Sequence, residues 1–188
     1  MESAIAPGFL VAAPHMRDPN FERSVVLMIE HDDQQGSFGL IVNREAEIDL
    51  SAVLGAMRVP LDAPVDIARH PPILAGGPVS PELGWIVHSA AWSRPETKRI
   101  TSDVAVTASV EILKAISRGD GPREYALFLG YAGWGPGQLI AEIRTGAWIT
   151  VPFERDLVFS VPFAARWVTA LERLGIDPRN IAPVIGDA

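Results

Sequence analysis

The chain contains no cysteine. This absence excludes disulfides, thiolate metal sites and cysteine nucleophiles together, and it is compatible with a reducing cytoplasm. Long apolar runs are also missing, and no segment approaches the roughly 18 uninterrupted apolar residues that a membrane-spanning helix requires. The apolar N-terminus carries Glu2 instead of a basic segment and is interrupted by Pro7 and Gly8, which does not fit a signal peptide. We therefore expect a cytoplasmic protein that contacts no membrane.

Basic residues are scarce and scattered. The chain has 16 lysines and arginines against 23 acidic residues, a formal net charge of −7, and no run of basic residues. A surface that binds nucleic acid needs clustered lysine and arginine to neutralise the phosphates. We therefore expect no direct binding of nucleic acid.

The local motifs of several common enzyme classes are absent. Gly130 and Gly135 have the spacing of a phosphate-binding loop, but Pro136 stands where that loop needs a lysine. Neither a dinucleotide-binding glycine pattern nor the Gly-x-Ser-x-Gly turn of the α/β-hydrolases occurs. No two histidines lie three or four residues apart, as metal-binding pairs on a helix do, so we expect no metal and no other cofactor. The four histidines are His15, His31, His70 and His88.

The sequence does contain enough apolar material for one core. A chain of 188 residues with 48% hydrophobic content can bury about 70% of its unfolded surface without help from metals or disulfides. Linkers, internal repeats and low-complexity tracts are absent. The sequence therefore predicts one domain that spans residues 1–188.

Short apolar runs and amphipathic segments follow one another irregularly. Asp49 is placed to cap a first helix, and Thr107 or Ser109 to cap a second. Pro136 suits the first position of a third helix, and residues 163–174 predict a fourth. The first three strands come without an intervening helix, which favours an α+β fold over a doubly wound α/β sheet. The expected strands are 9–13, 24–29, 38–42, 73–75, 85–88, 104–107, 125–129, 148–151 and 157–159.

The most distinctive segment runs from Leu127 to Glu142. An apolar strand there ends in a glycine-rich turn that contains Tyr131 and Trp134, and an amphipathic helix follows. Such a turn exposes backbone N–H groups and lets a ligand approach the main chain closely. Gln138 and Glu142 share one face of the helix. The segment predicts a small concave site, with a tight turn packed for structural reasons as the alternative.

Two shorter segments are further candidates for ligand binding. Asn43 and Arg44 follow a buried strand, at a position where ligands often bind in open sheets. Gly76, Gly77 and Pro78 follow another apolar run, and the glycines could present backbone amides to an anion. An ordinary turn at the first segment and close packing at the second are the structural alternatives.

Taken together, these segments resemble the AlgH/YqgE family of bacterial proteins. The resemblance implies a single α+β domain with a bent, branched, mostly antiparallel sheet flanked by about four helices. It implies no particular activity, although some members are labelled transcriptional regulators. The pieces that carry it, in order, are Phe9-Leu-Val-Ala-Ala-Pro-His-Met, Ser24-Val-Val, Glu30-His31, Gly39-Leu-Ile-Val-Asn-Arg44, Gly76-Gly77-Pro78-Val79 and Gly130-Tyr-Ala-Gly-Trp-Gly-Pro-Gly-Gln-Leu, with Trp148 behind them.

We interpret the chain as a non-enzymatic domain that binds a small ligand or a protein partner at a surface formed by the three candidate segments. The alternative is a hydrolase in which Glu142 is the general base beside His88 or Tyr131. A third interpretation is a regulator of transcription that acts indirectly, through a protein or small-molecule partner, because its charge disfavours contact with DNA.

Overall fold

The computed structural model describes residues 5–60 and 70–178, which contain one nine-stranded sheet. The strand order is β6-β7-β5-β8-β3-β2-β1-β9, with β4 attached to β8. All pairs are antiparallel except β4 with β8. The strands are β1 (Gly8–Ala12), β2 (Val25–Asp32), β3 (Gly36–Ile41), β4 (Leu74–Ala75), β5 (Val79–Ser89), β6 (Lys98–Arg99), β7 (Val104–Thr107), β8 (Tyr125–Trp134) and β9 (Trp148–Pro152).

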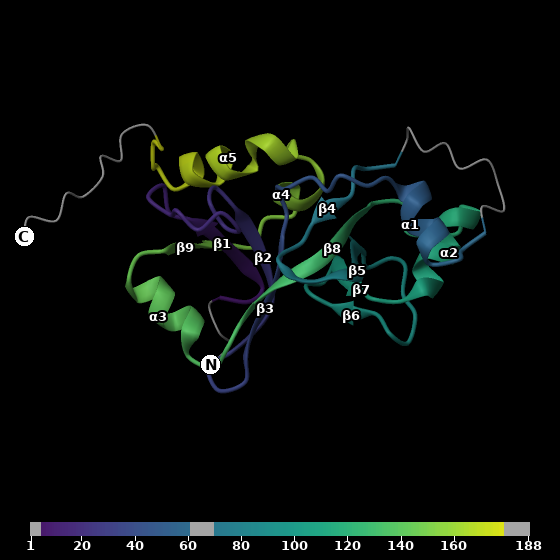
Figure 1. The fold of residues 1–188 in the computed structure, drawn as a ribbon, viewed down its shortest axis with the longest axis horizontal. Coiled ribbons are helices and arrows are strands. Elements are labelled where there is room, and N and C mark those ends of the chain that lie inside the picture. The colour runs from purple at the N-terminus through teal and green to yellow at the C-terminus, as the bar shows by residue number, and fades with distance from the viewer. Residues whose placement is uncertain (1–4, 61–69, 179–188) are drawn as a thin grey trace, which may run out of the picture.

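Strand β8 connects the two halves of the sheet (Figure 1). Its first half pairs with β5 from Tyr125 to Leu129, and its last residues pair with β3 from Ala132 to Trp134. β4 pairs with Phe128 and Leu129 along the same edge of β8 that pairs with β3 closer to its C-terminal end. The sheet therefore branches at β8. Gly130, between the two pairings, has φ +69°, a conformation that favours glycine. The bent, branched sheet predicted from the family resemblance is confirmed.

The sheet also curls toward itself. Lys98 of β6 forms an ion pair with Glu30 of β2, although four strands lie between β6 and β2 in the sheet order. Strand twist of one hand accumulates over many strands and brings distant strands closer together. The result is a curled antiparallel half-barrel.

Two of the candidate glycines lie where β4 and β5 pass β8 closely. A Cβ on Gly76 would overlap the carbonyl oxygen of Gly130, and one on Gly77 would overlap the backbone of Tyr131. Gly77 also has φ +154°. Close backbone packing, rather than a turn alone, therefore requires glycine at positions 76 and 77.

Five α-helices and a 3₁₀ turn cover the sheet in the described part of the chain. Helices α1 and α2 pack on one apolar cluster, α4 and α5 on a second, and α3 on a third. No helix within the described residues is long and apolar enough to cross a membrane. The elements are α1 (Leu50–Ala56), α2 (Val110–Arg118), α3 (Gln138–Arg144), α4 (Asp156–Phe159), η2 (Phe163–Ala165) and α5 (Arg166–Arg173).

The predicted N-caps of the first two helices are present. The Asp49 carboxylate accepts a hydrogen bond from the Ala52 N–H at 2.8 Å. The Ser109 hydroxyl oxygen accepts one from the Glu111 N–H at 3.1 Å, so Ser109, not Thr107, caps α2. Each cap satisfies a backbone donor that the helix itself cannot.

Three expectations about local structure are wrong. Residues 157–159 lie in helix α4, because three consecutive apolar residues fit a buried helical turn as well as a strand. β8 does not end at Leu129 but continues to Trp134, since β3 pairs with that stretch. Pro136 lies before the third helix, which begins at Gln138 after Gly137 with φ +71°.

Candidate functional site

Glu142 of α3 is held by three neutral donors. Its Oε2 atom accepts hydrogen bonds from Trp134 Nε1 at 2.9 Å and Trp148 Nε1 at 2.8 Å. Its Oε1 atom accepts one from Gln138 Nε2 at 2.8 Å, and Gln138 Oε1 in turn accepts the Gly135 N–H at 3.0 Å. We call these residues (Trp134, Gly135, Gln138, Glu142 and Trp148) the Glu142 network. Both carboxylate oxygens already have partners, which suits a brace between β8, α3 and β9.

Tyr131 and Trp134 do not form a shared aromatic wall. Tyr131 packs against Phe38 and Trp85, with ring centroids 5.1 and 6.2 Å away. Trp134 packs instead against Phe21 at 6.0 Å, in the apolar cluster beneath α3. The two aromatic residues of the glycine-rich segment thus belong to different clusters.

The other two candidate segments lie together. Asn43 Oδ1 accepts the Val25 N–H, and Asn43 Nδ2 donates to the Arg23 carbonyl, both at 2.8 Å. Arg44 Nη1 donates to the Asn20 carbonyl at 2.7 Å, and the Arg44 carbonyl accepts the Ala75 N–H at 2.8 Å. This last bond places Asn43 and Arg44 beside Gly76.

Gly76, Gly77 and Pro78 continue this contact toward β8. The Gly76 N–H donates to the Leu129 carbonyl at 2.7 Å, and its carbonyl accepts the Ile41 N–H at 2.7 Å. Pro78 is exposed. Gly76 and Gly77 therefore pack against Gly130 and Tyr131, and Arg44 is joined to the same segment through Ala75. Trp134, Gln138 and Glu142 form the separate Glu142 network. A ligand-binding role for these nine residues stays a prediction.

His88 of β5 is buried and has two partners. Its Nδ1 donates to the Ser89 carbonyl at 2.9 Å, and Nε2 accepts from the Thr107 hydroxyl at 2.9 Å. Burial lowers the pKa of His88, which favours this neutral form. His88 lies with β7 in one half of the molecule and Glu142 with α3 in the other (Figure 1). The pairing of His88 with Glu142 that one version of the alternative hydrolase requires is therefore not assembled. Within the described residues no group of three or more acidic and histidine side chains could hold a metal ion.

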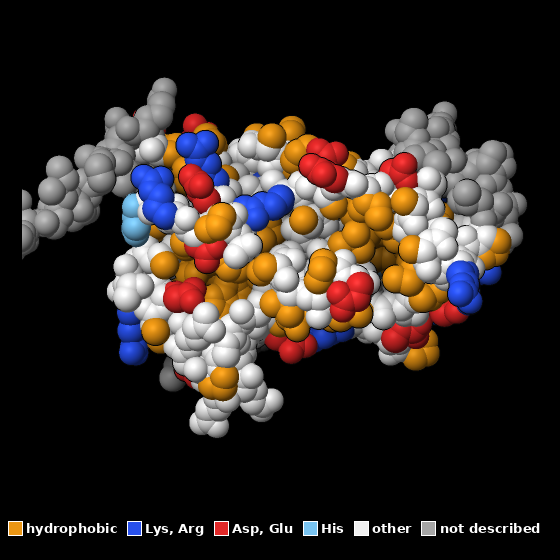
Figure 2. Space-filling view, in the orientation of Figure 1, with side chains coloured by type: hydrophobic (Ala, Val, Ile, Leu, Met, Phe, Trp, Pro, Cys, Tyr) orange, Lys and Arg blue, Asp and Glu red, His pale blue; other side chains and the backbone are white. Residues whose placement is uncertain are grey.

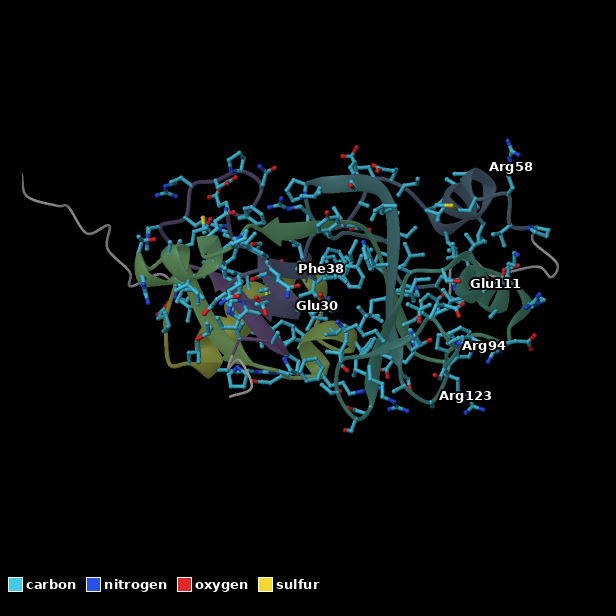
Figure 3. All side chains as sticks on the ribbon, turned by 90° about the horizontal axis from the view of Figure 1, so that it is seen from below. Glu30, Phe38, Arg58, Arg94, Glu111 and Arg123 are labelled. Carbon is cyan, nitrogen blue, oxygen red and sulfur yellow. The ribbon has the colours of Figure 1, made fainter. Side chains whose placement is uncertain are left out.

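A hydrogen-bonded chain of Ser37, His31 and Asp33 lies in the β2–β3 hairpin. Ser37 Oγ is 2.7 Å from His31 Nδ1, and His31 Nε2 is 3.1 Å from Asp33 Oδ1. The chain borders an open polar cavity of about 350 Å³. Glu30 and Phe38 line the same cavity and lie side by side in Figure 3. No sequence motif reveals this arrangement, because cross-strand pairing brings the serine to the histidine.

An apolar groove lies between α1, α2 and the sheet. It has a volume of about 260 Å³. Met57, Leu83 and Val110 line it and are 36%, 46% and 38% exposed. Figure 2 shows apolar side chains gathered in a hollow beside α1 and α2. The remaining lining residues are Val53, Glu82, Gly84, Trp85, Ile86, Ala108, Ser109, Leu113, Leu127 and Leu129.

Comparisons with known proteins agree with this fold. A family model described as AlgH-like matches residues 9–179. A UPF0301 protein of Anaeromyxobacter dehalogenans (strain 2CP-C) is 45% identical over 180 residues, 94% of this chain and 91% of the relative. The solution structure of the AlgH protein from Pseudomonas aeruginosa is 35% identical, with a TM-score of 0.80, and the match covers 100% of this chain and 98% of that one. A crystal structure from Corynebacterium diphtheriae, 24% identical, shares the fold with a TM-score of 0.69 over 90% of this chain and 86% of that one.

Proposed function

This chain belongs to the AlgH-like family, and we propose that it is a non-enzymatic binding domain whose apolar groove accepts an apolar group of a small ligand or of a partner protein. One observation carries the proposal. Seven large apolar side chains are exposed among the described residues, and three of them, Met57, Leu83 and Val110, line this groove. Exposed apolar residues are normally scattered singly, and a gathering of them marks a binding site.

The size of the groove limits what it accepts. A cavity of 150 Å³ lined by apolar residues is enough for benzene, so the groove of about 260 Å³ accommodates a bicyclic aromatic group or two aliphatic side chains. The cysteine-free sequence supports a cytoplasmic location. With a net charge of −7, any role in transcription would act through the bound partner rather than through DNA.

Titration with the neutral dye N-phenyl-1-naphthylamine tests this function. We expect its fluorescence to rise on binding to the native chain. Leu83→Asp and Val110→Asp each place a charge in the groove at an exposed position, so binding should weaken at least about tenfold. Val168→Asp is the matched control, because Val168 is 37% exposed on α5, away from the groove. Equal dye binding by all variants, or none by the native chain, would contradict the proposal.

A second candidate is ester hydrolysis by the chain of Ser37, His31 and Asp33. In this scheme Ser37 Oγ attacks the ester carbonyl, and His31 Nδ1 takes the hydroxyl proton and passes it to the leaving alcohol. Water then releases the acyl group. The Asp33 side chain is 70% exposed, so water competes for the bond that would orient His31. This exposure is why we rank hydrolysis second.

Labelling with a fluorophosphonate decides between the two functions. Hydrolysis predicts a covalent adduct on Ser37 that is absent from Ser37→Ala and from His31→Gln. If the native chain stays unlabelled but binds the neutral dye, hydrolysis by Ser37 is excluded and only the binding function remains.

A further inference from the structure

Arg166, the first residue of α5, is a buried cation without an acidic partner. It is 7% exposed. Its Nε donates to the Val161 carbonyl at 2.9 Å, and its Nη1 donates to the Val42 carbonyl. Within residues 5–60 and 70–178 no carboxylate lies within ion-pair distance of this guanidinium. Burial without such a partner lowers the pKa of Arg166 to about 10.

Three acidic residues that lie close in sequence to residues of a cavity beside Arg166 are paired with other arginines. Glu124 contacts Arg155, and both Glu154 and Asp156 contact Arg173. None of these carboxylates neutralises Arg166. Buried charges in proteins are normally paired, because an unpaired charge loses its hydration without compensation.

Arg166 lines a cavity that is otherwise largely apolar. The cavity has a volume of about 250 Å³ and lies between β4, the start of β8, α4 and η2. No acidic side chain is among the described residues that line it, and its other polar side chains are Tyr125 and Ser160. Phe159, Phe163 and prolines 71 and 72 supply much of the apolar wall.

The guanidinium has donors to spare. It carries five N–H groups, and the carbonyls of Val161 and Val42 take one each. The Nη2 atom has no hydrogen-bond partner among the described residues, and it is not fully enclosed by protein atoms. The two carbonyls hold the side chain in place, while Nη2 and the second N–H of Nη1 have no partner in the described part of the chain.

We infer that this cavity binds a small organic monocarboxylate, with the carboxylate on Arg166 and an aromatic or branched aliphatic body against Phe159 and Phe163. The ligand charge would neutralise the buried cation, and the apolar wall would exclude strongly hydrated anions. A cavity of about 250 Å³ has room for one ring with its carboxylate and not for a nucleotide. The inference is separate from the apolar groove, which none of these residues line.

Calorimetric titration of the full chain with benzoate and isovalerate tests the inference. Benzamide, a neutral analogue of benzoate, tests the need for charge, and formate tests the need for an apolar body. We expect benzoate or isovalerate to bind at least about tenfold more tightly than benzamide and formate, since charge-assisted hydrogen bonds are the strong ones. Failure of both carboxylates to bind, or equal binding of benzamide or formate, would overturn it.

Three variants test the location of the site: two change the cavity, and the third is a control. Arg166→Gln removes the charge and should abolish binding of the carboxylates. Ser160→Asp places a carboxylate in the cavity at an exposed position, so the fold is retained and benzoate affinity should fall at least about tenfold. Arg144→Gln changes an exposed arginine on α3 and should leave the affinity unchanged. If Arg166→Gln does not fold, Ser160→Asp decides, and undiminished benzoate binding by that variant refutes the site.

Discussion

Replacement of Glu142 by alanine tests whether the Glu142 network is structural. Trp134 and Trp148 are only 5% and 3% exposed, and both indole N–H groups donate to Glu142 Oε2. Alanine would leave these two buried donors without an acceptor, at about 1–3 kcal/mol each. We therefore expect the free energy of unfolding to fall by about 2–6 kcal/mol. For a chain of this size the unfolding midpoint would fall by about 4–24 °C.

Matched variants separate the lost hydrogen bonds from other effects. Glu142→Gln keeps a side-chain oxygen that can accept from both indoles, so its loss should be about 1 kcal/mol. Glu172→Ala removes an exposed carboxylate on α5 and should change stability by no more than about 0.5 kcal/mol. Urea unfolding followed by circular dichroism measures all three. Equal stability of Glu142→Ala and Glu172→Ala would refute a structural role for the Glu142 network. A loss of partner binding with unchanged stability would make Glu142 a functional residue instead.

Two further predictions concern backbone packing and pH. Gly77→Ala should lower the free energy of unfolding by about 3 kcal/mol or more, because its Cβ would overlap Tyr131 and its φ is +154°. The control Gly84→Ala should have almost no effect, because the space around its Cβ is open. Equal urea midpoints for the two variants would contradict this prediction. Burial lowers the pKa of His88 in the folded chain below its ordinary 6.5, so the unfolded chain binds more protons and stability should fall as the pH drops through about 6.5. The unfolding midpoint should therefore vary less between pH 7.5 and 5 in His88→Gln than in the native chain, and identical slopes would refute the role of His88.

Local signals predicted the elements of the fold well wherever the element depends on its own residues. Asp49 and Ser109 cap helices because their side chains reach backbone donors two or three residues away. Leu157 and Val158 were wrongly predicted as part of a strand, since both are buried in the same apolar cluster as α5 and a helix buries them as fully as a strand would. The continuation of β8 beyond Gly130 depends on β3, more than 90 residues earlier in the chain, and no local pattern reveals that pairing.

The candidate sites were less predictable, because each gathers residues from distant segments. The apolar groove combines α1, β5, α2 and β8, and its members look like ordinary core positions in the sequence. Arg166 is one arginine among many until the structure shows that it is buried and forms no ion pair within the described residues. The sequence shows which residues are charged, but only the fold determines which charged side chain is buried without a partner.

The glycine-rich segment shows that a distinctive sequence can meet structural requirements residue by residue. Gly130 permits the bend of β8, Gly77 permits the close passage of the chain beside Tyr131, and Trp134 serves the Glu142 network. Each unusual residue thus has a structural partner that demands its type. The apolar groove has the opposite character, because Leu83 and Val110 could be polar without loss of any hydrogen bond or cap that the structure contains. Where apolar side chains stay exposed together, selection for binding is the simpler explanation.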